Sequence, residues 1–77
     1  MLYFFKLISD ADPLPDEEGS ELPDLETAIF RSMRMAREII GEEAKMGRVP
    51  LGWSIEIADE TRAAVATTAF ADVVTLH

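Results

Sequence analysis

Cysteine is absent from this 77-residue sequence, which excludes disulfides and thiolate metal ligands. Histidine occurs once, as His77, the last residue, and chain ends are usually poorly ordered. No serine has an evident base nearby, and an acid–base pair such as Asp16 and Glu18 would need a burial that so polar a segment does not offer. We therefore expect no catalytic residue, no metal ligand, no cofactor and no enzymatic activity.

A long hydrophobic run is also missing, so the sequence predicts no membrane-spanning helix. The apolar start, MLYFFKLIS, lacks the basic residues and the cleavage site of a signal peptide. The length fits one small domain over residues 1–77. We expect this domain to be soluble and cytoplasmic, since a chain without cysteine suits a reducing compartment.

Positive charge is missing from one segment in particular. Residues 10–26 carry eight Asp or Glu and no Lys or Arg, while the rest of the chain carries seven acids and seven bases. The net charge of −8 therefore lies in that segment. Because no basic stripe is present to contact phosphates, we expect no nucleic-acid binding by the monomer.

The first residues have the period of a β-strand. From Leu2 to Ser9 the side chains alternate, so that Tyr3, Phe5 and Leu7 share one face. The acidic segment that follows contains three prolines and a glycine, which break regular structure. It leaves room for one short edge strand around Leu14.

Residues 24–46 have the period of a long amphipathic helix. Apolar side chains recur at spacings of three and four in one stripe, formed by Leu25, Ala28, Ile29, Met33, Ala36, Ile39, Ile40 and Ala44. Asp24 is suited to cap the start of this helix. Gly47 is suited to end it, although Gly41 offers an earlier end.

Two short extended runs follow the helix and predict a hairpin. Trp53, Ile55 and Ile57 alternate with polar or small residues, and a second run from Ala63 to Phe70 follows the turn at residues 59–62. The sequence thus predicts an α+β fold. It consists of a small antiparallel-dominated sheet of three to four strands, in the order β-(β)-α-β-β, with one long helix on one face.

Five short motifs are spread over most of the chain: Tyr3-Phe4-Phe5 with Leu7, Asp16-Glu17-Glu18-Gly19-Ser20-Glu21-Leu22, Pro23-Asp24-Leu25-Glu26 with Ala28, Ala36-Arg37-Glu38, and Asp59-Glu60. As a set they resemble a family of small bacterial proteins known only as a domain of unknown function. Two positions depart from that pattern: Lys6 stands where such proteins often carry His, and Thr61-Arg62 lacks the glycine usual in that turn. The resemblance implies the fold and no activity.

A second, more distant similarity concerns the start of the helix. A strand and an acidic turn that lead into Asp-Leu-Glu-x-Ala are similar to the partner-binding domain of HicB-type antitoxins. This pattern implies a class of function, the binding of another protein, and no particular partner.

The acidic segment matches a calcium loop only in part. Counted from Asp10, the residues Asp12, Glu18 and Glu21 fall at the third, ninth and twelfth positions of an EF-hand. The fifth and sixth positions are Leu and Pro, where a ligand and a glycine are required, and the preceding element is a strand. We interpret the segment as a solvated turn and helix cap. The alternative is an acidic small-ligand or divalent-ion-binding domain that uses residues 10–26.

A single helix leaves apolar surface without cover. Leu2, Phe4 and Ile8 lie on the face of the first strand that the helix does not reach, and Phe30 falls outside the helix stripe, beside two arginines. Either residues 70–74 fold over the strand face or a second chain does. With Leu2, Phe4, Ile8 and Phe30 as interaction residues, we expect a non-enzymatic protein–protein interaction or dimerisation module, with a homodimer or another protein as its partner.

Overall fold

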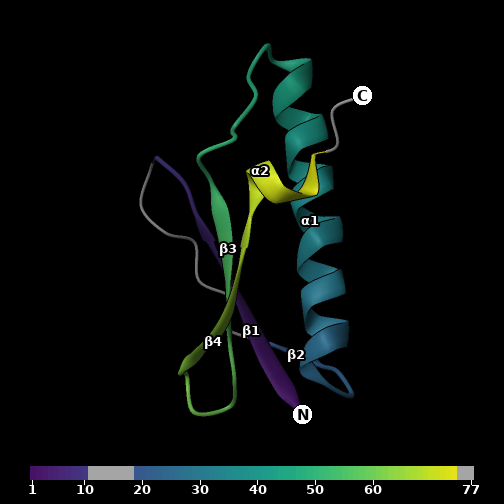
Figure 1. Ribbon diagram of the computed structural model, residues 1–77, viewed down its shortest axis with the longest axis vertical. Helices are drawn as coiled ribbons and strands as arrows, with labels where there is room; N and C mark the ends of the chain where they lie inside the picture. The colour runs from purple at the N-terminus through teal and green to yellow at the C-terminus, as the bar shows by residue number, and fades with distance from the viewer. Residues whose placement is uncertain (11–18, 75–77) are drawn as a thin grey trace.

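Helix α1 packs against one face of a four-stranded sheet, so the protein has two layers (Figure 1). The structure is a computed structural model and describes residues 1–10 and 19–74. Along the chain the elements are β1 (Leu2–Ile8), β2 (Ser20–Glu21), α1 (Leu25–Lys45), β3 (Ser54–Ala58), β4 (Ala64–Ala69) and α2 (Phe70–Val73). The predicted α+β fold is confirmed.

The strands lie in the order β2-β1-β3-β4, and each neighbouring pair is antiparallel. The central pair joins β1 to β3, with Phe4 opposite Ala58 and Ile8 opposite Ser54. The short edge strand is β2, whereas the sequence placed it around Leu14, which lies outside the described residues. β4 forms the other edge of the sheet.

Both ends of α1 follow the predicted capping. The carboxylate of Asp24 accepts a hydrogen bond of 2.8 Å from the backbone amide of Thr27. After the last turn, Gly47 has a φ of 81°, a left-handed conformation that glycine adopts at little cost. The helix continues through Gly41, so the earlier end is not used.

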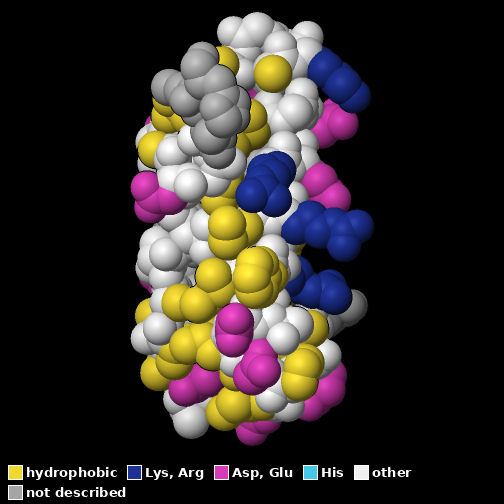
Figure 2. Space-filling view, turned by 45° about the vertical axis from the view of Figure 1, so that its right-hand side comes forward, with side chains coloured by type: hydrophobic (Ala, Val, Ile, Leu, Met, Phe, Trp, Pro, Cys, Tyr) yellow, Lys and Arg dark blue, Asp and Glu magenta, His cyan; other side chains and the backbone are white. Residues whose placement is uncertain are grey.

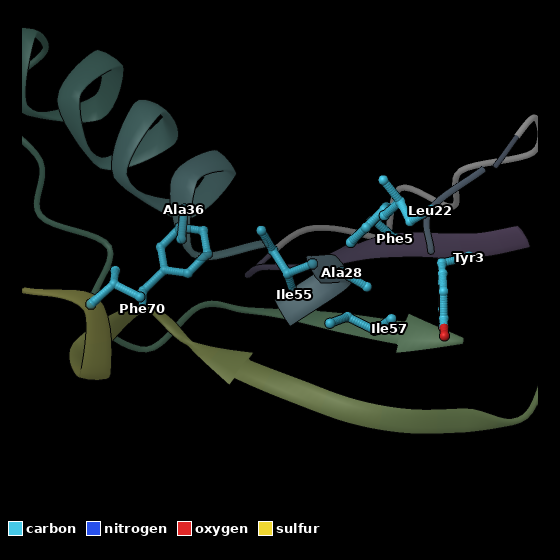
Figure 3. Packing of buried hydrophobic residues seen from close by; sticks show 9 residues of the cluster. Tyr3, Phe5, Leu22, Ala28, Ala36, Ile55, Ile57 and Phe70 are labelled. Atoms are coloured by element: carbon cyan, nitrogen blue, oxygen red, sulfur yellow. The ribbon is translucent and has the colours of Figure 1, made fainter. Parts of the chain in front are cut away.

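The core lies between α1 and the sheet (Figure 3). It is formed by Tyr3, Phe5, Leu22, Ala28, Ala36, Ile55, Ile57, Phe70 and Val73. Tyr3 and Phe5 come from the predicted inner face of β1. The small side chains of Ala28 and Ala36 leave room in this core, and the Phe70 ring lies beside Ala36.

The C-terminal part of β4 differs from the prediction. The extended run was expected to reach Phe70, but the chain turns there into α2, which packs against α1. Phe70 is completely buried on the α1 side of the sheet, with its ring centroid 6.1 Å from that of Trp53. Of the two expected covers for the outer sheet face, the C-terminal one is therefore not used by residues 70–73.

Helix α1 is offset toward one side of the sheet, since its backbone lies closest to β3 and β4. At the contact with β4, the Ser32 and Thr68 hydroxyl oxygens lie 2.5 Å apart and both residues are buried. Ser32 also donates a 2.7 Å hydrogen bond to the carbonyl of Ile29. The Thr68 hydroxyl therefore serves as the donor to Ser32. The sequence did not predict this contact, because a serine in a helix and a threonine in a strand are ordinary polar residues.

Candidate interaction surfaces

The outer face of the sheet carries three of the four predicted interaction residues. Phe4 is only 8% exposed, while Leu2 and Ile8 are half-buried. None of the three belongs to the core beneath α1, so the predicted side of the strand is correct. The ring of Phe4 is nevertheless covered by its own chain.

Arg62 provides one part of that cover. Its guanidinium carbon lies 3.8 Å from the centre of the Phe4 ring, in a cation–π contact. The residue has a φ of 68°, the conformation that glycine takes at little cost in such a turn. The departure noted in the sequence at Thr61-Arg62 thus has a structural counterpart: an arginine occupies a glycine-like backbone position and its side chain packs on Phe4.

Gly19 covers the same ring from another segment. A Cβ atom at this position would come within 2.9 Å of Phe4 Cε1, and its φ is 75°. Both the contact and the backbone conformation favour glycine. The glycine of the Asp-Glu-Glu-Gly motif is therefore explained by close packing on Phe4.

The turn before Arg62 is held by one carboxylate. Asp59 accepts hydrogen bonds from the Thr61 hydroxyl at 2.6 Å, the Thr61 amide at 2.8 Å and the Ala63 amide at 3.3 Å. The Thr61 hydroxyl is the main reason that the pKa of Asp59 lies below its usual value, with the backbone amides adding to it. The turn is thereby fixed where Arg62 must place its guanidinium.

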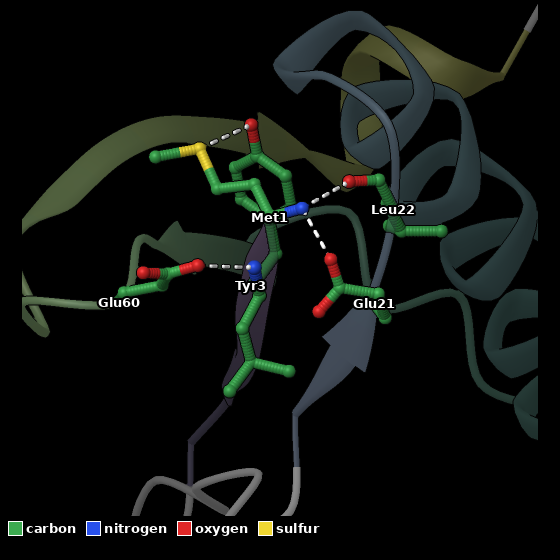
Figure 4. Close-up of polar contacts among 6 residues, drawn as sticks. Met1, Tyr3, Glu21, Leu22 and Glu60 are labelled. Carbon is green, nitrogen blue, oxygen red and sulfur yellow. Dashed lines mark hydrogen bonds and ion pairs between the residues drawn. The ribbon is translucent and has the colours of Figure 1, made fainter.

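Two further carboxylates hold the start of β1 (Figure 4). The Met1 ammonium group donates to the carboxylate of Glu21 and, at 3.0 Å, to the carbonyl of Leu22. The Leu2 amide donates to Glu60 Oε1 at 3.0 Å. Glu21, which falls at the last position of the rejected calcium loop, thus has a structural partner.

The described residues contain no group of three or more His, Asp or Glu side chains placed to hold a metal ion. Asp10 is exposed, and the other two calcium-loop positions, Asp12 and Glu18, lie outside the described part of the chain, as does His77. Asp16 also lies outside it, so the structure places neither member of the possible acid–base pair.

Phe30 lies on the outer side of α1 and is 62% exposed. Three exposed arginines surround it in the helix: Arg31, Arg34 and Arg37. Figure 2 shows Lys and Arg side chains in a column beside hydrophobic ones on this side of the molecule. A shallow hollow of about 390 Å³ lies among Thr27, Phe30, Arg31, Arg34, Met35 and Glu38.

The charges around Phe30 are mostly unpaired. Arg34 Nε lies 3.9 Å from Glu38 Oε1, a loose contact between exposed side chains. Neither Arg31 nor Arg37 has a carboxylate within ion-pair distance among residues 1–10 and 19–74. Phe30 and the outer sheet face belong to opposite layers, so the four predicted interaction residues do not form one surface.

A family model matches residues 2–71, which is most of the chain. Its description is a domain of unknown function, DUF6894. The chain belongs to this family. The predicted resemblance to an uncharacterised family is thereby confirmed, and no curated protein and no solved structure matches the chain.

This DUF6894 domain has one exposed feature that the sequence reasoning missed, the edge strand β4. Its sequence, AVATTA, contains no charged residue and no proline. Ala64, Val65 and Thr67 are exposed. The signal was present in the uncharged composition, but it becomes meaningful only once the strand order places β4 at an edge.

The described helices of this DUF6894 domain include none that is both long and apolar enough to cross a membrane. The longest, α1, is amphipathic and carries charged residues along its outer side.

Proposed function

We propose that the domain is a non-enzymatic protein–protein interaction module that acts as a homodimer or on a protein partner. The observation that carries this proposal is Phe30, which is 62% exposed on α1. Burial of a phenylalanine side chain is worth about 1.5–3 kcal/mol, and that free energy is not used in the monomer.

The neighbours of Phe30 support the same proposal. A single exposed apolar residue is ordinary, but Phe30 is surrounded by arginines of which Arg31 and Arg37 have no charged partner among the described residues. Aromatic residues and arginine are the types enriched at the centres of protein interfaces. The pattern shared with the partner-binding domain of HicB-type antitoxins agrees with this class of function. The lack of cysteine and the family resemblance support a cytoplasmic, bacterial setting.

The test uses a photo-crosslinking amino acid in place of Phe30, in the full chain and in its native cell. The matched control carries the same amino acid in place of Val49, which is 63% exposed and lies outside the Phe30 surface. We expect one defined cross-linked polypeptide, the chain itself or another protein, from position 30 and not from position 49. Equal and heterogeneous cross-linking from both positions would overturn the proposal.

A further inference from the structure

We propose that a second copy of the chain pairs with β4, antiparallel and edge to edge. The two sheets then join into one continuous sheet, and both α1 helices lie on the same face of it. The inference rests on the proposed function and names its partner.

The β4 edge is suited to such pairing. The outward-facing amides and carbonyls of Ala64–Ala69 have no strand beside them among the described residues. Natural edge strands are usually protected by charge, proline, a bulge or short length. β4 has no charge and no proline, and the register shift at Ile57/Ala58 lies next to the turn, so the rest of the strand is regular.

Among the described residues, the other edge of the sheet is formed by β2 beside Leu2 and Tyr3 and by β1 itself from Phe4 to Ile8. β2 consists of Ser20 and Glu21 alone, which is too short to template a partner strand. Pairing of β4 with β4 of a second copy joins the same edge of both chains about a two-fold axis, and such a contact closes. We therefore infer a dimer and not an open filament.

The offset of α1 gives the two helices a suitable separation. The α1 backbone lies closest to β3 and β4, and strands in a sheet lie about 4.8 Å apart. For a helix above the middle of that strand pair, a two-fold axis beside β4 lies about 5 Å away. The two-fold axis then places the helices roughly 10 Å apart. Packed helices lie about 8–10 Å apart, so α1 and its copy would be in contact.

The contact between Ser32 and Thr68 indicates which part of α1 lies at the axis. α1 and β4 run in the same direction (Figure 1). The centre of β4, between Ala66 and Thr67, lies about 5 Å before Thr68 along the strand. The same distance along the helix is about three residues, counted back from Ser32. That level is Ile29, one residue before the exposed Phe30, so Phe30 would lie near its own copy.

The side chains on this flank of α1 suit a helix partner. Phe30, Met33 and Arg37 are spaced by three and four residues and share one flank. Figure 2 shows hydrophobic side chains gathered beside the column of Lys and Arg side chains on this side of the molecule. This side of α1 therefore has apolar side chains at its centre and charged side chains toward its ends.

The charges at the two ends are complementary. With the axis near Ile29, two antiparallel helices place Glu26 within two residues, or about 3 Å along the helix, of Arg34 in the second copy. Within the described part of the chain, Glu26 has no ion pair, and Arg34 has only the loose contact with Glu38. Opposite charges would thus meet in a protein whose net charge of −8 otherwise opposes self-association.

The first experiment measures the mass of the full chain by sedimentation velocity over a range of concentrations. We expect a monomer–dimer equilibrium. Val65→Lys and Phe30→Glu should each raise the dissociation constant by about tenfold or more. Matched controls are Val49→Lys and Met46→Glu, which place the same charges on other exposed residues, 63% exposed for Val49 and 59% for Met46. These two controls should leave the dissociation constant unchanged. Circular dichroism identifies variants that do not fold, and Thr67→Lys then replaces Val65→Lys.

The second experiment tests the register. Glu26→Arg and Arg34→Glu should each weaken the dimer, and the double exchange should restore it. A wild type that stays monomeric at all concentrations overturns the dimer, as does a dimer that neither Val65→Lys nor Phe30→Glu weakens. If the monomeric wild type still cross-links from position 30 to a different protein, the dimer is overturned while the proposed function stands. If the monomeric wild type gives no such cross-links, both the dimer and the proposed function are overturned.

Discussion

The guanidinium of Arg62 lies over the ring of Phe4, with 3.8 Å between its central carbon and the ring centre. The contact covers an aromatic side chain on the sheet face that α1 does not reach. The same residue has a φ of 68°, which costs a residue with a side chain about 1 kcal/mol relative to glycine. A favourable contact and an unfavourable backbone conformation therefore meet in one residue.

These opposing effects can be separated by two substitutions. Arg62→Ala removes the contact and keeps the backbone cost, so we expect a loss of about 1–2 kcal/mol in the free energy of unfolding. Arg62→Gly also removes the backbone cost and should lose about 1 kcal/mol less. Urea denaturation measures both, with Arg31→Ala as a control. Equal losses for the two variants would show that the backbone at residue 62 is unstrained.

The buried hydroxyl pair predicts non-additive substitutions. Ser32→Ala leaves the Thr68 hydroxyl buried without its partner, which costs about 1–3 kcal/mol. Thr68→Val leaves Ser32 its bond to the carbonyl of Ile29, so the loss should be smaller. The double variant should lose less than the sum, as measured in a denaturant double-mutant cycle. Additive losses would mean that the two hydroxyls do not interact.

The same substitution at a glycine inside α1 and at the glycine that follows it should have opposite effects. Gly41 lies inside α1 with nothing within 4 Å of an added Cβ, so Gly41→Ala should stabilise by about 0.5–1 kcal/mol. Gly47 has a φ of 81°, and its amide bonds at 3.0 Å to the carbonyl of Ala44. Gly47→Ala should therefore destabilise by about 1 kcal/mol. Thermal melts of both variants decide this, and a shared sign would contradict the assigned helix end.

Two capping aspartates predict a pH dependence. Hydrogen bonds from the Thr27 side chain and amide hold the pKa of Asp24 below its usual value, and the Thr61 hydroxyl does the same for the pKa of Asp59. The folded state therefore binds these protons less readily than the unfolded chain. The added stability is complete above the usual carboxyl pKa and is lost as the pH falls through the lower, folded value.

Asp24→Asn and Asp59→Asn test this sign. Each variant should be less stable than the wild type at neutral pH, and the difference should shrink as the pH falls below the usual carboxyl range. Urea melts at several pH values measure it, with the exposed Asp72→Asn as a control. A stability difference that stays constant with pH would contradict the charge-based explanation.

Much of the fold could be predicted because local patterns determine it. The alternation of Tyr3, Phe5 and Leu7 identified the inner face of β1, and Asp24 and Gly47 marked the ends of α1. The end of β4 could not be predicted in this way. Phe70 is a good strand residue, but it begins α2 because its ring packs into the core with Ala36 and Trp53, contacts that are distant in sequence.

The candidate surface was predicted only in part. Periodicity placed Phe4 on the outer face of the sheet and Phe30 outside the helix stripe, and both positions are correct. It could not show that Arg62 and Gly19 cover Phe4, because that depends on how a turn and a loop pack against β1. It also could not identify β4 as an edge, because strand order is set by pairings between residues far apart in the sequence.

The position of β1 in the sheet has a consequence for folding. β1 is apolar and comes first in the chain, but its longer partner is β3, with Phe4 opposite Ala58. The intervening segment is roughly fifty residues, so this pairing closes a long loop, whereas α1 and the β3–β4 hairpin require only local contacts. During synthesis the strand LYFFKLI is made well before β3 can receive it. Until then only the two-residue strand β2 can pair with it, and Tyr3 and Phe5 stay without the core that covers them, so we expect this segment to be the one that a chaperone binds in the nascent chain.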